Sequence, residues 1–219
     1  MHALLIGATG ATGKDLLDLL LKDNHFDHVD IFVRRNIDVQ HQKLSVHVID
    51  FDTSGQWQHL VKGDVLFSCL GTTLKAAGSK AAQRKIDYDY QYQFAVAARE
   101  NNVNTYVLVS SSFARPNSLS FYARMKGELE AAVKALAFPV LLIFNPPMLI
   151  RKNSDRPMEI AGLKLIHFLN KIGLFHSQKP LPTAVLAQAM INAAKTKKSG
   201  TKTYKASDIW QCAEEIEKR

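Results

Sequence analysis

The chain has 219 residues, 47% of them hydrophobic, and a formal net charge of +8, a composition typical of a globular protein. No apolar run is long enough to span a membrane and no basic segment precedes the apolar start, so we expect no membrane association and a cytoplasmic location. Two cysteines and eight scattered histidines predict neither a disulfide framework nor a metal site, and the positive charge accompanies no nucleic-acid motif.

Short apolar segments alternate with helical segments from the first residues onward. Strands are predicted at residues 3–6, 29–33, 46–49, 65–69, 106–109 and 140–144. Helices are predicted at 16–21, 86–100, 121–136, within 158–172, at 183–194 and from 207. This alternation is typical of βαβ units and predicts an α/β fold with a doubly wound parallel sheet, the NAD(P)-binding Rossmann fold.

The regular pattern stops after the strand predicted at 140–144. Asn145, Pro146 and Pro147 interrupt it, and a turn-rich stretch precedes the helix at 183–194. We find no linker and no internal repeat. The sequence therefore predicts a single domain over 1–219, with 145–182 as a small appendage on the substrate side.

Three glycines directly follow the first predicted strand, at Gly7, Gly10 and Gly13. In a dinucleotide-binding loop the first permits a sharp turn, the second lets the backbone approach a pyrophosphate, and the third packs the helix closely on the sheet. The pyrophosphate then lies at the helix N-terminus, where free N–H groups favour an anion. The loop residues predicted to bind the cofactor are Gly7, Thr9, Gly10, Ala11, Thr12 and Gly13.

Two arginines, Arg34 and Arg35, end the second predicted strand, about twenty residues beyond the loop, where NAD enzymes carry an acidic residue. Guanidinium groups suit a 2′-phosphate, so we expect NADP(H). The ends of the third and fourth strands add further candidate cofactor contacts: Asp50, Phe51, Cys69, Leu70, Gly71 and Thr72. Asp50 has two open interpretations, as an acceptor for the adenine amino group or as a loop cap.

Tyr122 and Lys126 are four residues apart on a predicted helix and therefore share one face. Reduction of a carbonyl needs a proton donor at oxygen, and a nearby ammonium activates a phenol whose ordinary pKa is about 10. We predict Tyr122 as acid/base and Lys126 as its electrostatic partner and a ligand of the nicotinamide ribose. Ser111, after the fifth strand, is predicted to orient the substrate oxygen, with Ser112 as the alternative.

Together these segments resemble the atypical branch of the short-chain dehydrogenase/reductase superfamily, most of all the Tat-interacting-protein-like oxidoreductases and their bacterial relatives. The resemblance is carried by GATGATG at 7–13, FSCLGTTLKAAGS at 67–79, KIDYDY at 85–90, LVSSSFA at 108–114, FYARMKGELE at 121–130 and IFNPPMLIRKNSDRPME at 143–159. It implies an NADP(H)-binding Rossmann fold with Ser111, Tyr122 and Lys126 as the triad. The chain departs at 145–147, where relatives commonly have Arg-Pro-Gly beside the nicotinamide.

Three functions are compatible with these features. The first is an NADP(H)-dependent oxidoreductase acting on a small carbonyl or alcohol, and the second is an NADP-binding sensor with little turnover. The third, a nucleic-acid or anionic-surface binder, has only the net charge in its favour. The intact Tyr122–Lys126 pair favours the oxidoreductase, because a sensor has no need of a proton donor.

Overall fold

The computed structural model describes residues 1–150 and 180–214. Seven strands form one sheet in the order β3-β2-β1-β4-β5-β6-β9, with every neighbouring pair parallel. The strands are β1 (His2–Ile6), β2 (His28–Val33), β3 (Leu44–Val48), β4 (Val65–Ser68), β5 (Thr105–Val109), β6 (Val140–Phe144) and β9 (Gly200–Tyr204). Strand order reverses beside β1, which confirms the doubly wound Rossmann sheet predicted from the sequence.

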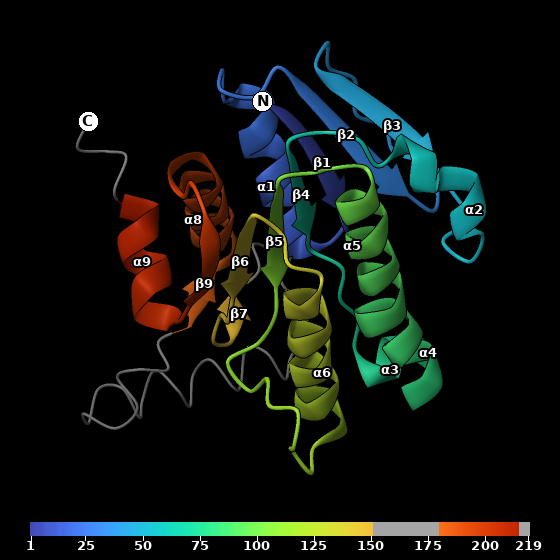
Figure 1. Ribbon diagram of the computed structural model, residues 1–219, viewed down its shortest axis with the longest axis vertical. Helices are drawn as coiled ribbons and strands as arrows, with labels where there is room; N and C mark the ends of the chain where they lie inside the picture. The colour runs from blue at the N-terminus through green and yellow to red at the C-terminus, as the bar shows by residue number, and fades with distance from the viewer. Residues whose placement is uncertain (151–179, 215–219) are drawn as a thin grey trace.

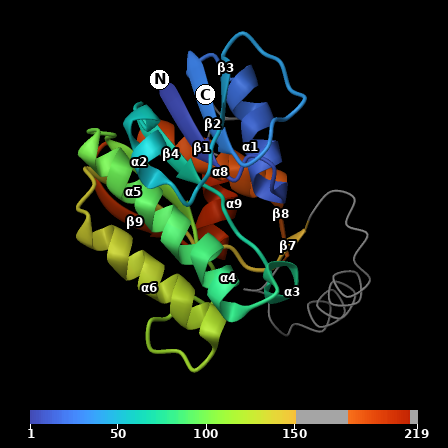
Figure 2. The same ribbon diagram turned by 90° about the vertical axis from the view of Figure 1, so that its right-hand side faces the viewer.

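Helices cover both faces of this sheet (Figure 1 and Figure 2). One face carries α1 (Ala11–Lys22), α8 (Thr183–Thr196) and α9 (Ala206–Glu214). The other carries α2 (Ser54–Trp57), the 3₁₀ turn η1 (Gln58–Leu60), α5 (Tyr90–Glu100) and α6 (Phe121–Ala135). Successive strand residues supply the two cores alternately, so Leu5 packs under α1 and α8 whereas Leu4 packs under α5. Among the described residues no helix is both long and apolar enough to cross a membrane.

Short elements connect this framework at the carboxyl ends of the strands. Between β4 and α5 the chain forms α3 (Leu74–Ala77), α4 (Lys80–Arg84) and the π-helical turn η2 (Lys85–Asp89), which runs directly into α5. The strands β7 (Leu149–Ile150) and β8 (Leu181–Pro182) pair as a second, two-stranded parallel sheet. The rest of the appendage predicted at 145–182, and the helix predicted within 158–172, lie outside the described residues.

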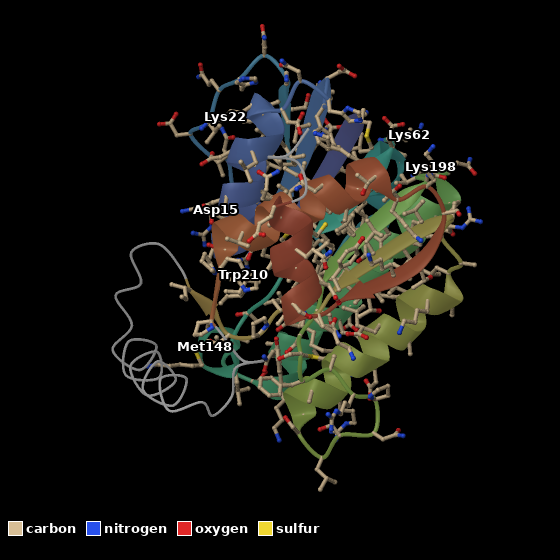
Figure 3. All side chains as sticks on the ribbon, turned by 90° about the vertical axis from the view of Figure 1, so that its left-hand side faces the viewer. Asp15, Lys22, Lys62, Met148, Lys198 and Trp210 are labelled. Atoms are coloured by element: carbon tan, nitrogen blue, oxygen red, sulfur yellow. The ribbon has the colours of Figure 1, made fainter. Side chains whose placement is uncertain are left out.

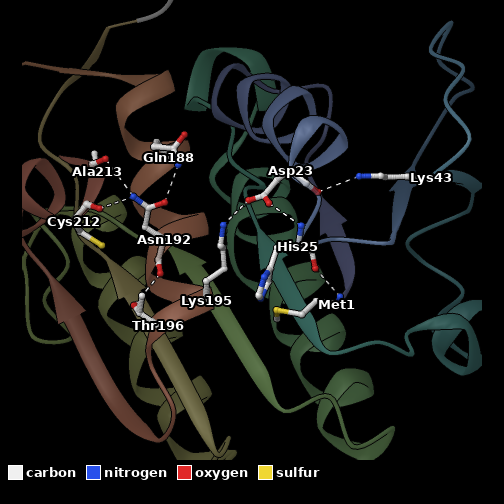
Figure 4. A network of polar contacts seen from close by, with 10 residues as sticks. All are labelled: Met1, Asp23, His25, Lys43, Gln188, Asn192, Lys195, Thr196, Cys212 and Ala213. Atoms are coloured by element: carbon white, nitrogen blue, oxygen red, sulfur yellow. Dashed lines mark hydrogen bonds and ion pairs between the residues drawn. The ribbon is translucent and has the colours of Figure 1, made fainter. Parts of the chain in front are cut away.

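Polar contacts fix α1, and with it the loop at its N-terminus, against α8 and α9. Thr183 Oγ1 of α8 donates to Asp15 Oδ2 of α1 at 2.6 Å. At the other end of α1, Lys195 Nζ lies 2.8 Å from Asp23 Oδ2 (Figure 4). Asn192 Nδ2 donates to the carbonyl of Cys212 at 2.8 Å and so joins α8 to α9. Figure 3 shows this helical face, with Asp15 on α1 and Trp210 on α9.

Candidate functional site

The turn between β1 and α1 requires two of its glycines for steric reasons. Gly7 has a φ of +85°, and a Cβ there would lie 2.5 Å from the carbonyl carbon of Cys69. A Cβ at Gly13 would collide with the carbonyl oxygen of Gly7. The N–H of Gly10 donates to the same oxygen at 2.9 Å and closes the turn. The turn therefore has the close backbone packing that a phosphate-binding glycine loop requires.

Gly10 differs from the other two glycines because a Cβ there would make a tight contact but no collision. Within the described part of the chain, a Cβ at Gly10 would meet the Gly7 carbonyl oxygen at 3.3 Å and nothing closer. Gly10 is also the N-cap of α1, and because it has no side chain, no side-chain oxygen caps the helix N-terminus. The first N–H groups of α1 are therefore available to an anion, and the residues present fit the pyrophosphate of a dinucleotide.

Two pockets open along the carboxyl ends of the strands. The first, of about 170 Å³, lies between the glycine loop, the end of β2 and α5. The second, of about 660 Å³, lies between the glycine loop, η2 and α6. Both are lined by Gly10, Cys69, Leu70, Gly71 and Thr72. The two pockets therefore meet at the glycine loop and the end of β4, where a doubly wound fold binds its cofactor.

Most of the predicted cofactor residues line the first pocket. They are Gly7, Thr9, Gly10, Arg34, Phe51, Cys69, Leu70, Gly71 and Thr72. Arg34 is exposed at its edge, and the buried Phe51 ring packs at 5.1 Å from the ring of Tyr90, a lining residue that sequence reasoning missed. Ala11 and Thr12 line the second pocket instead.

Three predicted cofactor residues lie elsewhere among the described residues. Gly13 acts through packing, as shown above, and Arg35 is exposed but lines neither pocket. Asp50 also lies outside both pockets. Its carboxylate accepts the N–H of Asp52 at 2.9 Å, and its carbonyl accepts the indole N–H of Trp57 at 3.0 Å. Of the two interpretations of Asp50, the structure shows the loop cap.

Tyr122 and Lys126 both line the second pocket, together with the N-terminus of α1. Tyr122 is 37% exposed, whereas Lys126 is 3% exposed. The loop before α6 lies directly on this helix at Gly127, where a Cβ would collide with the backbone of Arg115 and Pro116. Close packing of the loop and helix thus fixes the Tyr122–Lys126 face toward the pocket.

The structure does not bring the predicted orienting serine into this pocket. Ser111 Oγ accepts the N–H of Phe113 at 3.3 Å, and Ser112 is exposed. Of the three serines, Ser110 alone is among the described residues that line the pocket. Its hydroxyl donates to Glu130 Oε1 at 2.5 Å. Ser111 and Ser112 therefore remain predictions.

Sequence reasoning missed Asp87, a buried carboxylate in the same pocket. Asp87 is 1% exposed, and its Oδ1 lies 3.6 Å from Lys126 Nζ and 3.2 Å from the N–H of Thr72. Burial raises the pKa of the Asp87 carboxyl above its ordinary value, and Lys126 and the Thr72 N–H act against this rise. The sequence offers no signal for this contact, because Lys126 is distant from Asp87 in the chain and the burial of Asp87 appears only in the structure.

Cys69 lines both pockets, but its thiol is not an activated nucleophile. Burial raises the pKa of Cys69 to about 12, and the opposing effect of the Lys126 charge is smaller. The thiol is therefore neutral near pH 7 and serves as an apolar wall between the two pockets.

This chain is similar in sequence to a known protein family and to several fungal proteins. A family model described as NAD(P)H-binding matches residues 7–138. The mitochondrial protein FMP52 of Saccharomyces cerevisiae is 36% identical over 167 residues, 74% of this chain and 72% of that protein. The mitochondrial protein fmp52-1 of Aspergillus terreus is 34% identical over 217 residues, 94% of this chain and 92% of that protein.

Solved structures share the fold at much lower identity. MoeE5 in complex with UDP-glucose and NAD has a TM-score of 0.72 at 14% identity, covering 99% of this chain and 82% of MoeE5. WbmH of Bordetella bronchiseptica, in complex with NAD⁺, has a TM-score of 0.72 at 15% identity, covering 93% and 75% of the two chains. Such likeness is evidence of the fold alone.

These relatives correct two predictions made from the sequence. The resemblance to an atypical short-chain dehydrogenase/reductase holds for the fold, but the relatives found are fungal FMP52 proteins rather than Tat-interacting-protein-like bacterial ones. The predicted cytoplasmic location is wrong, because these relatives are named mitochondrial. The chain belongs to the NAD(P)H-binding family, in which the FMP52 proteins are its relatives.

Proposed function

We propose that the protein is an NADP(H)-dependent oxidoreductase acting on a small carbonyl or alcohol. The observation that carries this proposal is that Tyr122 and Lys126 line the same pocket as Gly10, Ala11 and Thr12. A proton donor and a pyrophosphate-binding loop thus open onto one cavity. The substrate would bind in this second pocket, beside α6.

The residues of the pocket divide the chemistry between them. When bound, the dinucleotide supplies a hydride to the carbonyl carbon or takes one from the alcohol. Tyr122 gives its phenolic proton to the carbonyl oxygen in reduction and accepts the alcohol proton in oxidation. The Lys126 ammonium lines the same pocket as Tyr122 and would donate a hydrogen bond to the nicotinamide ribose. Asp87 compensates the charge of this buried lysine.

The cofactor preference is a separate part of the proposal. Arg34 lines the first pocket next to the buried Phe51, at the end of β2. A guanidinium at this position suits the charge and the acceptor geometry of a 2′-phosphate, and no acidic residue replaces it at the strand end. These features support NADP(H) over NAD(H).

The test follows NADPH consumption with a panel of aldehydes, ketones and quinones. With an active substrate, Tyr122→Phe should lower kcat by a factor of about 10² to 10⁴ and leave NADPH affinity unchanged, because only the transferable proton is lost. Lys126→Ala should lower both kcat and NADPH affinity. The matched control is Tyr92→Phe, because Tyr92 lies on α5 and is not among the described residues that line either pocket.

Two results would contradict the proposal. Wild-type turnover in Tyr122→Phe would remove the proposed acid/base. Tight NADPH binding without oxidation by any member of the panel would favour the alternative, an NADP sensor.

A further inference from the structure

A second group of polar side chains lies in the first halves of β1 and β2 and on the neighbouring strand β3, whereas the cofactor cleft lies at the carboxyl ends of the strands. His2 begins β1 opposite His28, which begins β2, and Asp30 follows His28 by two residues. Asp30 lies opposite Ser45 of β3, and His47 follows Ser45 by two residues. Because alternate strand residues share a face, all five side chains lie on the same face of the sheet. We call His2, His28, Asp30 and His47 the strand-start cluster.

The imidazoles of the strand-start cluster converge on one carboxylate. His2 Nε2 lies 2.8 Å from Asp30 Oδ2, and His28 Nε2 lies 3.2 Å from Asp30 Oδ1. One nitrogen or oxygen from each of His2, His28 and Asp30 lies within 4.8 Å of the others. His47 Nε2 also lies 3.2 Å from Asp30 Oδ1. Three separate strands thus aim nitrogen atoms at the same anion.

The burial of Asp30 makes its negative charge costly to leave without a cation. Asp30 is 7% exposed, and across the described residues its ion-pair partners are imidazoles, with no lysine or arginine among them. His47 Nε2 is buried, and within the described part of the chain it makes no hydrogen bond, although it lies 3.2 Å from Asp30 Oδ1. A buried carboxylate without a permanent cation leaves a site that a bound cation would satisfy.

The donor set selects the class of cation. Two imidazole nitrogens and one carboxylate oxygen suit a borderline transition metal, whereas Mg²⁺ and Ca²⁺ prefer oxygen ligands. In a tetrahedral zinc site with bonds of about 2.0–2.2 Å, neighbouring ligand atoms lie about 3.3–3.5 Å apart. The contacts of 2.8 Å and 3.2 Å are to different oxygens of Asp30, and the three candidate ligand atoms lie within 4.8 Å of one another, so the side chains must rotate to close on one ion. Metal binding would replace the contact of His28 Nε2 with Ser45 Oγ at 2.9 Å.

We propose that His2, His28 and Asp30 bind one divalent transition metal ion, for which Zn²⁺ is the test ion. His47 acts as a positioning residue, because it contacts the carboxylate oxygen that also faces His28. Bound metal would join β1 to β2 through side chains in addition to their backbone hydrogen bonds. The proposed ligands are separate from the proposed oxidoreductase site, because His2, His28 and Asp30 line neither of the two pockets described above. His47 stacks on Phe32, which lines the first of these pockets.

The experiment uses the full, untagged chain, stripped of metal with a chelator and titrated with Zn²⁺ by calorimetry. We expect one Zn²⁺ per chain and a melting temperature that rises with Zn²⁺ concentration. Co²⁺ should give the visible absorption of a low-coordinate site. NADPH affinity should be the same with and without Zn²⁺, which separates this proposal from the cofactor site.

Variants identify the ligands. His28→Gln and Asp30→Asn should each weaken Zn²⁺ binding at least tenfold, and His47→Gln should weaken it about tenfold. Because the His47 ring also stacks on Phe32, the readout for His47→Gln is the rise in melting temperature on adding Zn²⁺, which should be smaller than in wild type. His59→Gln, an exposed histidine in η1, is the matched control and should bind as wild type.

The proposal is overturned if Zn²⁺ binding does not saturate at one equivalent. It is equally overturned if folded His28→Gln and Asp30→Asn bind Zn²⁺ as tightly as wild type. Either result would mean that the strand-start cluster is a set of hydrogen-bonded imidazoles and nothing more. If Asp30→Asn does not fold, His2→Gln and His28→Gln carry the test.

Discussion

Gly10 can be changed with less disturbance of the backbone than Gly7 or Gly13, which makes it the best single residue for testing the phosphate loop. A Cβ there would lie 3.3 Å from the Gly7 carbonyl oxygen, so the turn must shift slightly, whereas Gly7 and Gly13 are required by the fold itself. Gly10→Val should therefore keep the circular dichroism spectrum but lose detectable NADPH binding, because its side chain would enter the space that a pyrophosphate needs. Gly55→Val in α2, where a Cβ would meet no described atom within 4 Å, is the control. A folded Gly10→Val protein with wild-type affinity would rule out the loop as the phosphate site.

Asp87 is predicted to act through Lys126 rather than on the substrate. Asp87→Asn removes the carboxylate 3.6 Å from Lys126 Nζ, so the buried ammonium becomes harder to keep charged. We expect kcat to fall about tenfold and the alkaline limb of the kcat–pH profile to move to lower pH. A merely structural role would lower stability and leave this limb where it is. Asp89→Asn, in the same π-helical turn, is the control.

The residues that sequence reasoning missed share one property: their partners are distant in the chain. Asp87 meets Lys126 because η2 and α6 pack side by side, and His2 meets Asp30 because β1 and β2 pair in register. Spacing along the chain carries no signal for such contacts. The glycine loop and the Tyr122–Lys126 pair could be predicted because their geometry lies within one turn or one helix.

At the scale of elements, apolar composition decided which strands could be predicted. The six strands found from the sequence are rich in apolar residues: β4 and β6 are buried at every residue, whereas β3 is only partly buried. The seventh strand, β9, was not predicted. It is an edge strand, and residues Gly200, Thr201 and Lys202 are exposed, so it has no apolar run to detect.

The contact between α1 and α8 predicts a pH-dependent stability. Burial alone would raise the pKa of Asp23, but hydrogen bonds from Lys195 and the His25 N–H hold it below the ordinary value of 3.8 (Figure 4). The ionised carboxylate therefore stabilises the fold above 3.8, and this contribution is lost as pH falls through the lowered pKa. Lys195→Met should lower the free energy of unfolding at neutral pH by about 0.5–1 kcal/mol.

Urea unfolding at a series of pH values checks this prediction. The difference between Lys195→Met and wild type should shrink as the pH falls below 3.8. Lys198→Met, an exposed lysine beyond α8 (Figure 3), should show no such difference. A deficit in Lys195→Met that is constant with pH would show that the Asp23 charge is not involved.

For the whole molecule, the alternation of strands and helices was sufficient to predict a doubly wound parallel sheet, because parallel βαβ units connect in only a few ways. The strand order and the seventh strand come from the structure. Location was not predictable in this way, and the names of the relatives contradict the cytoplasmic expectation. We further propose that residues 1–219 form one domain, since the seven-stranded sheet draws strands from both ends of the described chain.

The central claim is that the cleft at the carboxyl ends of the strands binds NADP(H), and calorimetric titration with NADPH and NADH tests it most directly. NADPH should bind wild type at least tenfold more tightly than NADH, a difference of about 1.4 kcal/mol. Arg34→Ala should abolish this preference, whereas Arg35→Ala should keep it, because only Arg34 of the two lines the described pocket. Equal affinities for the two cofactors in wild type, or a preference that survives in Arg34→Ala, would contradict the account.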